Sequence, residues 1–129
     1  MKEKLIKLLD LSYSPYSNFK VSSIVIMKDG KEFTGVNIEN ASYSATICAE
    51  RVAIFKAISE GYTKKDFHKL YVMSSSNNIT PSCFICRQVI TEFFDSESEI
   101  IFITPTGKTA TYKVKDVCPL PFNSSSLEG

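Results

Sequence analysis

Three cysteines stand where two segments of helical pattern begin, and this arrangement constrains the fold more than any other feature of the sequence. Cys48 opens the stretch 48–60, whereas Cys83 and Cys86 open the stretch 83–94. Zinc binds thiolates readily, and a catalytic zinc ion has three protein ligands and one position left for water. The three cysteines therefore predict a zinc site where the N-terminal ends of the two helices meet.

The rest of the chain alternates between strand and helix patterns. Apolar residues at helical spacing predict an amphipathic helix over 3–12, which Ser14-Pro15 ends because the residue before a proline disfavours helix. Asp29-Gly30 predicts a tight hairpin turn between two strands. The predicted strands cover residues 19–27, 31–37, 69–75, 99–104 and 109–114. This order indicates an α/β fold in which helices cover a sheet.

Length and composition indicate one folded domain over residues 1–129. Hydrophobic residues make up 43% of the 129 residues and charged residues make up 22%. A chain of this composition can bury a hydrophobic core without disulfides, and its size suits a single domain. The polar stretch 123–129 predicts a flexible tail.

The charge distribution argues against several classes of partner. The net charge is +1, from 15 basic and 14 acidic residues, and no concentrated basic face predicts nucleic-acid binding. No apolar run reaches the length of about 18 residues that a membrane span needs. Asp10 interrupts the N-terminal stretch too early for a secretory signal, so we expect a cytoplasmic protein.

Glu50 lies two residues after Cys48 and indicates the chemistry of the site. In zinc deaminases, a metal ligand is followed at this spacing by a glutamate that exchanges protons without binding the metal, and a Cys-x-x-Cys pair comes later. Three thiolates give the centre a net negative charge, which weakens zinc as a Lewis acid. The two helix N-termini offset part of this charge. We expect Arg51 to offset more of it by donating hydrogen bonds to the thiolates.

With these motifs, the chain resembles the small homotetrameric cytidine deaminases. The matching stretches are residues 34–61 (TGVNIENASYSATICAERVAIFKAISEG) and 86–93 (CRQVITEF), with weaker matches at 14–21 and 119–125. The resemblance extends from about Tyr13 to Phe122. It implies a three-layer α/β/α fold with a mixed five-stranded sheet, and one zinc ion per chain.

The resemblance also implies the reaction. Members of the family convert cytidine or deoxycytidine and water into uridine or deoxyuridine and ammonia, a step of pyrimidine salvage. By position, Glu50 takes a proton from the attacking water, protonates N3 of the base and later protonates the leaving amine. One carboxylate can do this because each transfer needs the opposite protonation state.

Four residues of the matching stretches correspond to nucleoside-binding positions of the family. Phe19 packs against the pyrimidine, and Ala49 offers its backbone N–H to the base carbonyl. Asn37 and Glu39 bind the ribose hydroxyls. The Glu39 carboxylate can accept hydrogen bonds from these hydroxyls, and the Asn37 amide can both donate and accept them. No glycine-rich phosphate loop or basic cluster lies near these positions, so we expect a nucleoside rather than a nucleotide.

Three further residues correspond to positions that act across subunits in the family. The resemblance implies that Ala41, Tyr43 and Phe122 reach the site of a neighbouring chain. We therefore expect a homotetramer with shared sites.

Three departures from the family pattern lie close to these motifs. The proline that usually precedes Cys-x-x-Cys comes one place early, at Pro81. Phe84 stands where glycine is common, and it would be strained if that position required a positive φ. Ser22-Ser23 stands where the family has Gly-Ala, and the extra hydroxyls bear on packing near the base. These changes concern substrate range and rate more than metal binding.

Two other functions remain open at this point. One is a deaminase of a modified cytosine nucleoside or a nucleoside antibiotic, although the NIENASY loop (37–43) favours ordinary nucleosides. The other is a structural zinc protein, whose site would need a fourth protein ligand. Neither His68 nor Cys118 is spaced to supply that ligand, and Glu50 beside the metal would then have no purpose.

Overall fold

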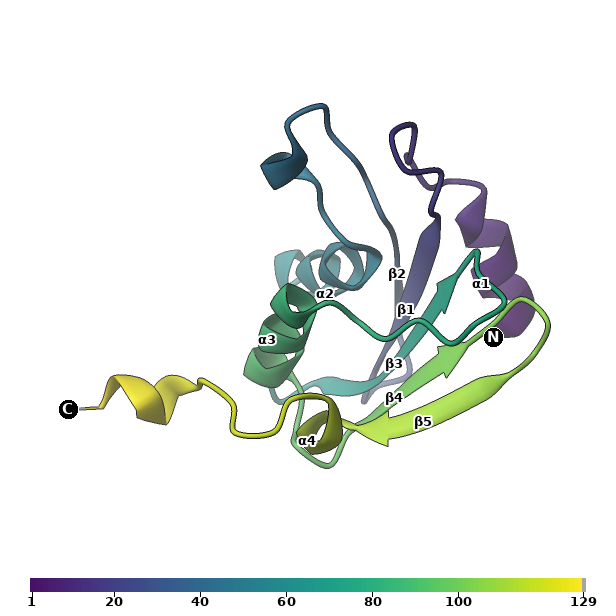
Figure 1. The fold of residues 1–129 in the computed structure, drawn as a ribbon. Helices are drawn as coiled ribbons and strands as arrows, with labels where there is room; N and C mark the ends of the chain where they lie inside the picture. Colours follow the sequence, from purple (N-terminus) through teal and green to yellow (C-terminus); the bar gives the residue numbers. More distant parts are fainter. Residues whose placement is uncertain (129) are drawn as a thin grey trace.

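A mixed five-stranded sheet forms the centre of the protein (Figure 1), which a computed structural model describes over residues 1–128. The strand order is β2-β1-β3-β4-β5. β1 pairs antiparallel with β2 and β3, β3 pairs parallel with β4, and β4 pairs antiparallel with β5. The strands are β1 (Val21–Met27), β2 (Glu32–Val36), β3 (Phe67–Ser74), β4 (Glu99–Ile103) and β5 (Thr109–Lys113). The predicted mixed five-stranded sheet is therefore confirmed.

The β1–β2 hairpin turns where the sequence predicts it. Gly30 has a φ of +92°, a backbone conformation that glycine adopts without steric cost. Its N–H donates to the carbonyl of Met27 at 2.9 Å, and the Asp29 carboxylate accepts from the N–H of Lys31 at 2.9 Å. These local bonds fix the register in which Ser22 lies opposite Val36.

Helices cover both faces of the sheet and give three layers (Figure 1). The helices are α1 (Lys2–Leu9), α2 (Ala49–Ser59), α3 (Phe84–Phe93) and the short α4 (Val114–Val117). Neighbouring residues of a strand point to opposite faces. Accordingly, Ile24 packs with Leu5 of α1, whereas Val25 packs with Ile54 of α2. The three-layer α/β/α architecture is confirmed.

Gly35 lets α2 lie directly against β2. A Cβ atom at this position would come within 2.2 Å of the Ala49 carbonyl oxygen and 2.7 Å of the Ala53 backbone nitrogen. Both are backbone atoms that a side-chain rotation cannot move away. This contact sets the depth of the first turn of α2, which carries Glu50.

Element boundaries differ from the predictions in places where non-local contacts decide them. The first helix ends at Leu9 rather than residue 12, and the first strand begins at Val21 rather than residue 19. The carbonyl of Phe19 accepts a hydrogen bond from the Asn37 side chain instead of joining the sheet.

Three short elements have no counterpart in the sequence predictions. They are α4 and the 3-10 helices η1 (Tyr43–Ala45) and η2 (Ser124–Leu127). Each has three or four residues, too few for a periodic pattern to appear. Gly129, the last residue of the predicted flexible tail, lies outside the described residues. Among those described, no helix has the length and apolar character of a membrane span.

Candidate metal centre and active site

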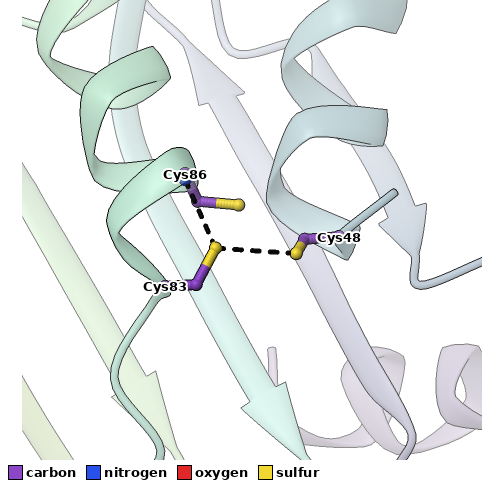
Figure 2. A group of neighbouring side chains, drawn as sticks. All are labelled: Cys48, Cys83 and Cys86. Atoms are coloured by element: carbon purple, nitrogen blue, oxygen red, sulfur yellow. Dashed lines mark hydrogen bonds between the residues drawn. The ribbon is translucent and has the colours of Figure 1, made fainter. Parts of the chain in front are cut away.

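The structure brings the three predicted cysteine ligands together between α2 and α3 (Figure 2). The Sγ atoms of Cys48, Cys83 and Cys86 all lie within 4.8 Å of one another, and those of Cys48 and Cys83 are 3.7 Å apart. All three thiols are free. Two sulfurs bound to one tetrahedral zinc ion at about 2.3 Å are about 3.8 Å apart. The donor set therefore fits zinc in both chemistry and spacing.

Helix N-termini position the thiols and supply positive potential. Cys48 is the N-cap residue of α2, and Cys83 is the N-cap residue of α3. The Cys83 sulfur accepts a hydrogen bond from the backbone N–H of Cys86 at 3.4 Å. Thiolates at these ends lie at the positive poles of two helix dipoles.

Arg51 contacts the metal centre directly. Its guanidinium donates from Nη2 to the Cys48 sulfur at 3.4 Å. The neighbouring Cys86 thiol, followed by the Arg51 guanidinium, lowers the pKa of Cys48 to about 5. Interaction with Cys48 and burial raise the pKa of Cys86. A thiolate at Cys48 is thus stabilised by a cation that stands beside it.

Glu50 points into the protein beside these thiols. The side chain is 3% exposed, and burial raises the pKa of its carboxyl group above the usual range. The Ser82 hydroxyl opposes this shift. Among residues 1–128, the side chains close enough together to hold a metal ion are those of the three cysteines, and Glu50 is not one of them. The Glu50 carboxyl group thus lies beside the three thiols without belonging to the group that could hold a metal.

A cavity of about 280 Å³ opens onto this centre. Glu50, Cys48 and Cys83 are among its lining residues. Its other lining residues, largely apolar, are Phe19, Val21, Asn37, Thr46, Ile47, Val72, Ser74, Thr80 and Pro81. The cavity therefore has a mainly apolar lining that includes a buried carboxyl group and two of the three clustered thiols.

The two predicted ribose-binding residues occupy adjoining hollows. Asn37 lines the cavity, with its side chain accepting from the Val21 N–H at 2.9 Å and donating to the Phe19 carbonyl at 2.8 Å. Glu39 lines a neighbouring hollow of about 310 Å³, and Thr46 borders both spaces.

The Glu39 carboxylate is held by the loop that precedes Phe19. It accepts from the N–H groups of Tyr16 and Ser17 at 3.0 and 3.1 Å, and from the Ser17 hydroxyl. The Ser17 hydroxyl is the main cause that lowers the pKa of Glu39, which keeps the group an ionised acceptor.

The remaining predicted site residues lie at different distances from this cavity. Ala49 is fully buried in the first turn of α2. Tyr43 lines the hollow next to Glu39 and is 78% exposed, while Phe122 is 58% exposed. Ala41 is also exposed, and neither it nor Phe122 borders the cavity of its own chain. The structure thus does not bring Ala41 and Phe122 to the cavity that contains Glu50.

The departures from the family pattern have specific structural outcomes. Phe84 begins α3 and is not among the described non-glycine residues with a positive φ, so it carries none of the strain that a glycine position would impose. The Ser22 hydroxyl donates to the Leu5 carbonyl at 2.8 Å and ties β1 to α1. Within residues 1–128, the buried Ser23 hydroxyl has no hydrogen-bond partner.

Sequence reasoning missed Thr46, which borders both hollows, and Arg87, which holds the loop before Cys83. Thr46 lies in the polar stretch before Cys48 and has no chemical signature of its own. Arg87 directly follows the ligand Cys86, and that adjacency was the available signal.

Known proteins similar to this chain belong to a zinc-binding family, in agreement with the three clustered cysteines. Residues 1–104 match the family described as the cytidine and deoxycytidylate deaminase zinc-binding region. A probable cytidine deaminase of Dictyostelium discoideum is 42% identical over 88% of this chain and 82% of its own length. A cytidine deaminase of Halalkalibacterium halodurans is 37% identical over 90% of this chain and 86% of its own length.

A solved structure shows the same fold. The crystal structure of cytidine deaminase from Burkholderia pseudomallei superposes with a TM-score of 0.89 at 35% identity, covering 93% of this chain and 94% of the other. A match of this extent covers nearly the whole of both chains. The chain therefore belongs to the zinc-binding cytidine and deoxycytidylate deaminase family.

Proposed function

We propose that this protein is a zinc-dependent deaminase that converts cytidine and deoxycytidine to uridine and deoxyuridine with release of ammonia. The observation that carries the proposal is the buried Glu50 carboxyl group, which shares one cavity with Cys48 and Cys83. A structural zinc site would need a fourth protein ligand and no buried acid.

The reaction requires proton transfers that Glu50 is placed to make. When bound by the three cysteines, zinc acts as a Lewis acid that makes hydroxide available from water near neutral pH. Glu50 takes the proton that the water loses and delivers it to N3 of the base while the water oxygen bonds to C4. Glu50 then moves the second proton of that oxygen to the amino group. The C4–N bond breaks, ammonia leaves, and a carbonyl remains at C4.

The lining of the cavity supports a neutral nucleoside as substrate. Phe19 provides an aromatic ring beside the slot, and the N–H of Ala49 serves the base carbonyl. Asn37 and Glu39 serve the ribose. Among the described residues that line the cavity, there is no lysine or arginine to bind a phosphate. Arg51, which follows Glu50 in the sequence, already donates a hydrogen bond to the Cys48 sulfur.

The exposed aromatic residues support a homotetramer with shared sites. Tyr43 and Phe122 present large rings to solvent in the single chain, although such rings are normally buried. Ala41 and Phe122 complete the cavity of a neighbouring chain in this proposal. Three free thiols suit a reducing compartment, so the enzyme works in the cytoplasm, where it recovers pyrimidines for reuse.

The test is the loss of ultraviolet absorbance when zinc-replete protein is mixed with cytidine or deoxycytidine. We expect both nucleosides to react, and cytidine monophosphate to react at least tenfold more slowly because the cavity lacks a cation for its phosphate. Glu50→Gln serves as the control, since it keeps the size of the side chain and removes the acid.

The alternative is a deaminase of a modified cytosine nucleoside or a nucleoside antibiotic. Turnover of such a compound by wild-type protein that binds zinc but leaves cytidine unchanged would replace the proposed function with this one. Equal rates for cytidine and its monophosphate would contradict the assignment to nucleosides.

A further inference from the structure

We propose that Arg87 is a positioning residue of the metal centre, because it ties the peptide before Cys83 to the end of α4 and so fixes the loop that presents this ligand. The inference rests on the zinc-binding part of the proposed function. It concerns Arg87 itself, which follows the ligand Cys86 and does not touch the thiols.

The contacts of Arg87 reach two separate parts of the chain. Its Nε atom donates to the Ser82 carbonyl at 2.7 Å, and its Nη1 atom donates to the Val117 carbonyl at 3.0 Å. Ser82 immediately precedes Cys83, and Val117 is the last residue of α4. One side chain thus joins the loop that enters α3 to the segment that follows the last strand.

The loop before Cys83 depends on this bond. Pro81 has no N–H to donate, and the buried Ser82 hydroxyl acts on the Glu50 carboxyl group. Within residues 1–128, the hydrogen bond from Arg87 is the one that holds the Ser82 backbone. Thr80 and Pro81 line the cavity, so a shift of this loop would move both Cys83 and a wall of the substrate site.

Phe84 keeps the guanidinium of Arg87 in place. The guanidinium carbon lies 4.3 Å from the centre of the Phe84 ring, a cation–π contact. Phe84 is 75% exposed and has this contact in place of burial. The family commonly has glycine here, so the stacked ring is a feature of this chain that helps to orient Arg87.

Lysine could not replace Arg87. The two carbonyls, on different segments, accept from two different nitrogen atoms that the planar guanidinium holds apart, whereas lysine has one nitrogen at the end of a flexible stem. The chain has only two arginines: Arg51 donates to the Cys48 sulfur, and Arg87 donates to the carbonyl that precedes Cys83. This use of arginine indicates a geometric role rather than a need for charge.

The test is competition for zinc between the protein and a chromogenic chelator, with Arg87→Lys compared to wild type. Loss of residues that orient metal ligands usually weakens metal binding about 10–100-fold, and we expect a change in this range. Gln88→Ala is the matched control. Gln88 lies on the same turn and donates to the Phe122 carbonyl at 2.8 Å, so it contacts the C-terminal segment but not Ser82.

We expect Gln88→Ala to bind zinc within about twofold of wild type. Unchanged zinc affinity in Arg87→Lys, or equal weakening in both variants, would overturn the proposal. If Arg87→Lys does not fold, Phe84→Leu replaces it, because this change removes the stacked ring and leaves the hydrogen bonds possible. A several-fold weakening in Phe84→Leu supports the role, and no weakening overturns it. The chelator measurement needs no turnover, so its failure is distinct from failure of the proposed reaction.

Discussion

Glu50 combines burial with proximity to thiols, and both properties act on its proton affinity. Burial favours the neutral acid, and the Cys48 thiolate adds repulsion that also raises the pKa. The Ser82 hydroxyl and Arg51 favour the ionised form. A carboxyl group whose pKa is raised in this way holds a proton more readily than an exposed one, and the two transfers of the proposed deamination require a group that takes up and returns a proton.

Replacing Glu50 by glutamine should stabilise the metal-free protein at neutral pH. Because the folded-state pKa of Glu50 is raised, its ionised form costs stability at pH values above the ordinary value of 4.5. Below that value the group is protonated in both folded and unfolded chains, and the cost is absent. Urea denaturation should therefore show a more stable Glu50→Gln variant at pH 7 and no gain at pH 4. Exposed Glu92→Gln is the control, and an equal gain there, or a gain at pH 4, would contradict this account.

At the scale of elements, local signals predicted most of the fold. Asp29-Gly30 marked the hairpin, and apolar periodicity marked the helices that begin beside Cys48 and Cys83, because each signal acts between neighbours in sequence. The short α4 escaped prediction because burial of Val114 and Val117, and not periodicity, accounts for it.

In the candidate site too, local sequence signals predicted some features and missed others. The cysteine spacing and the position of Glu50 indicated the metal centre, since these residues sit at helix starts. The hydrogen bonds from the Val21 N–H to the Asn37 side chain and from Arg87 to the Val117 carbonyl join residues 16 and 30 positions apart, and no local pattern reports such contacts. Sequence therefore gives the chemical groups, while tertiary packing decides which of them hold the loops.

The contact between Gly35 and α2 gives a prediction at the scale of elements. Gly35→Ala should push back the first turn of α2, because its Cβ atom would overlap the Ala49 carbonyl. Overpacking of this kind costs about 1–3 kcal/mol of unfolding free energy. We also expect at least a tenfold loss of deaminase rate, since Cys48 and Glu50 move with that turn.

Gly61→Ala is the matched control for this change. Gly61 has a φ of +97° beyond the other end of α2, with no atom within 4 Å of an added Cβ. Alanine there costs about 1–2 kcal/mol through backbone strain alone. Its deaminase rate and zinc affinity should stay close to wild type when measured well below the unfolding temperature. A similar loss of rate in both variants would show that stability, and not the position of α2, limits activity.

At the scale of the whole molecule, the single chain builds the metal centre but leaves part of its predicted substrate site exposed. Cys48, Cys83 and Glu50 meet at one cavity, whereas Phe122 lies in the C-terminal segment that extends away from the sheet (Figure 1). If Phe122 contributes to the site of a neighbouring chain, substitutions of Glu50 and of Phe122 in one chain impair two different sites of the tetramer.

Mixing two inactive variants tests this arrangement. Glu50→Gln and Phe122→Ala chains, dissociated and reassembled together, should form some sites with an intact Glu50 and an intact Phe122. We expect activity clearly above the sum of the separate variants, measured by cytidine absorbance, with sedimentation to verify four chains per particle. Activity equal to that sum, or a monomer that is fully active, would contradict shared sites.

The central claim is that three cysteines hold one zinc ion beside Glu50, and that both are needed to deaminate cytidine. The most direct test measures zinc per chain and cytidine turnover on the same samples of wild type and Glu50→Gln. The account predicts one zinc ion per chain in both proteins, with turnover in wild type and a loss of at least a thousandfold, about 4 kcal/mol of transition-state stabilisation, in Glu50→Gln. Substantial turnover in Glu50→Gln, or full turnover in wild type without zinc, would contradict it.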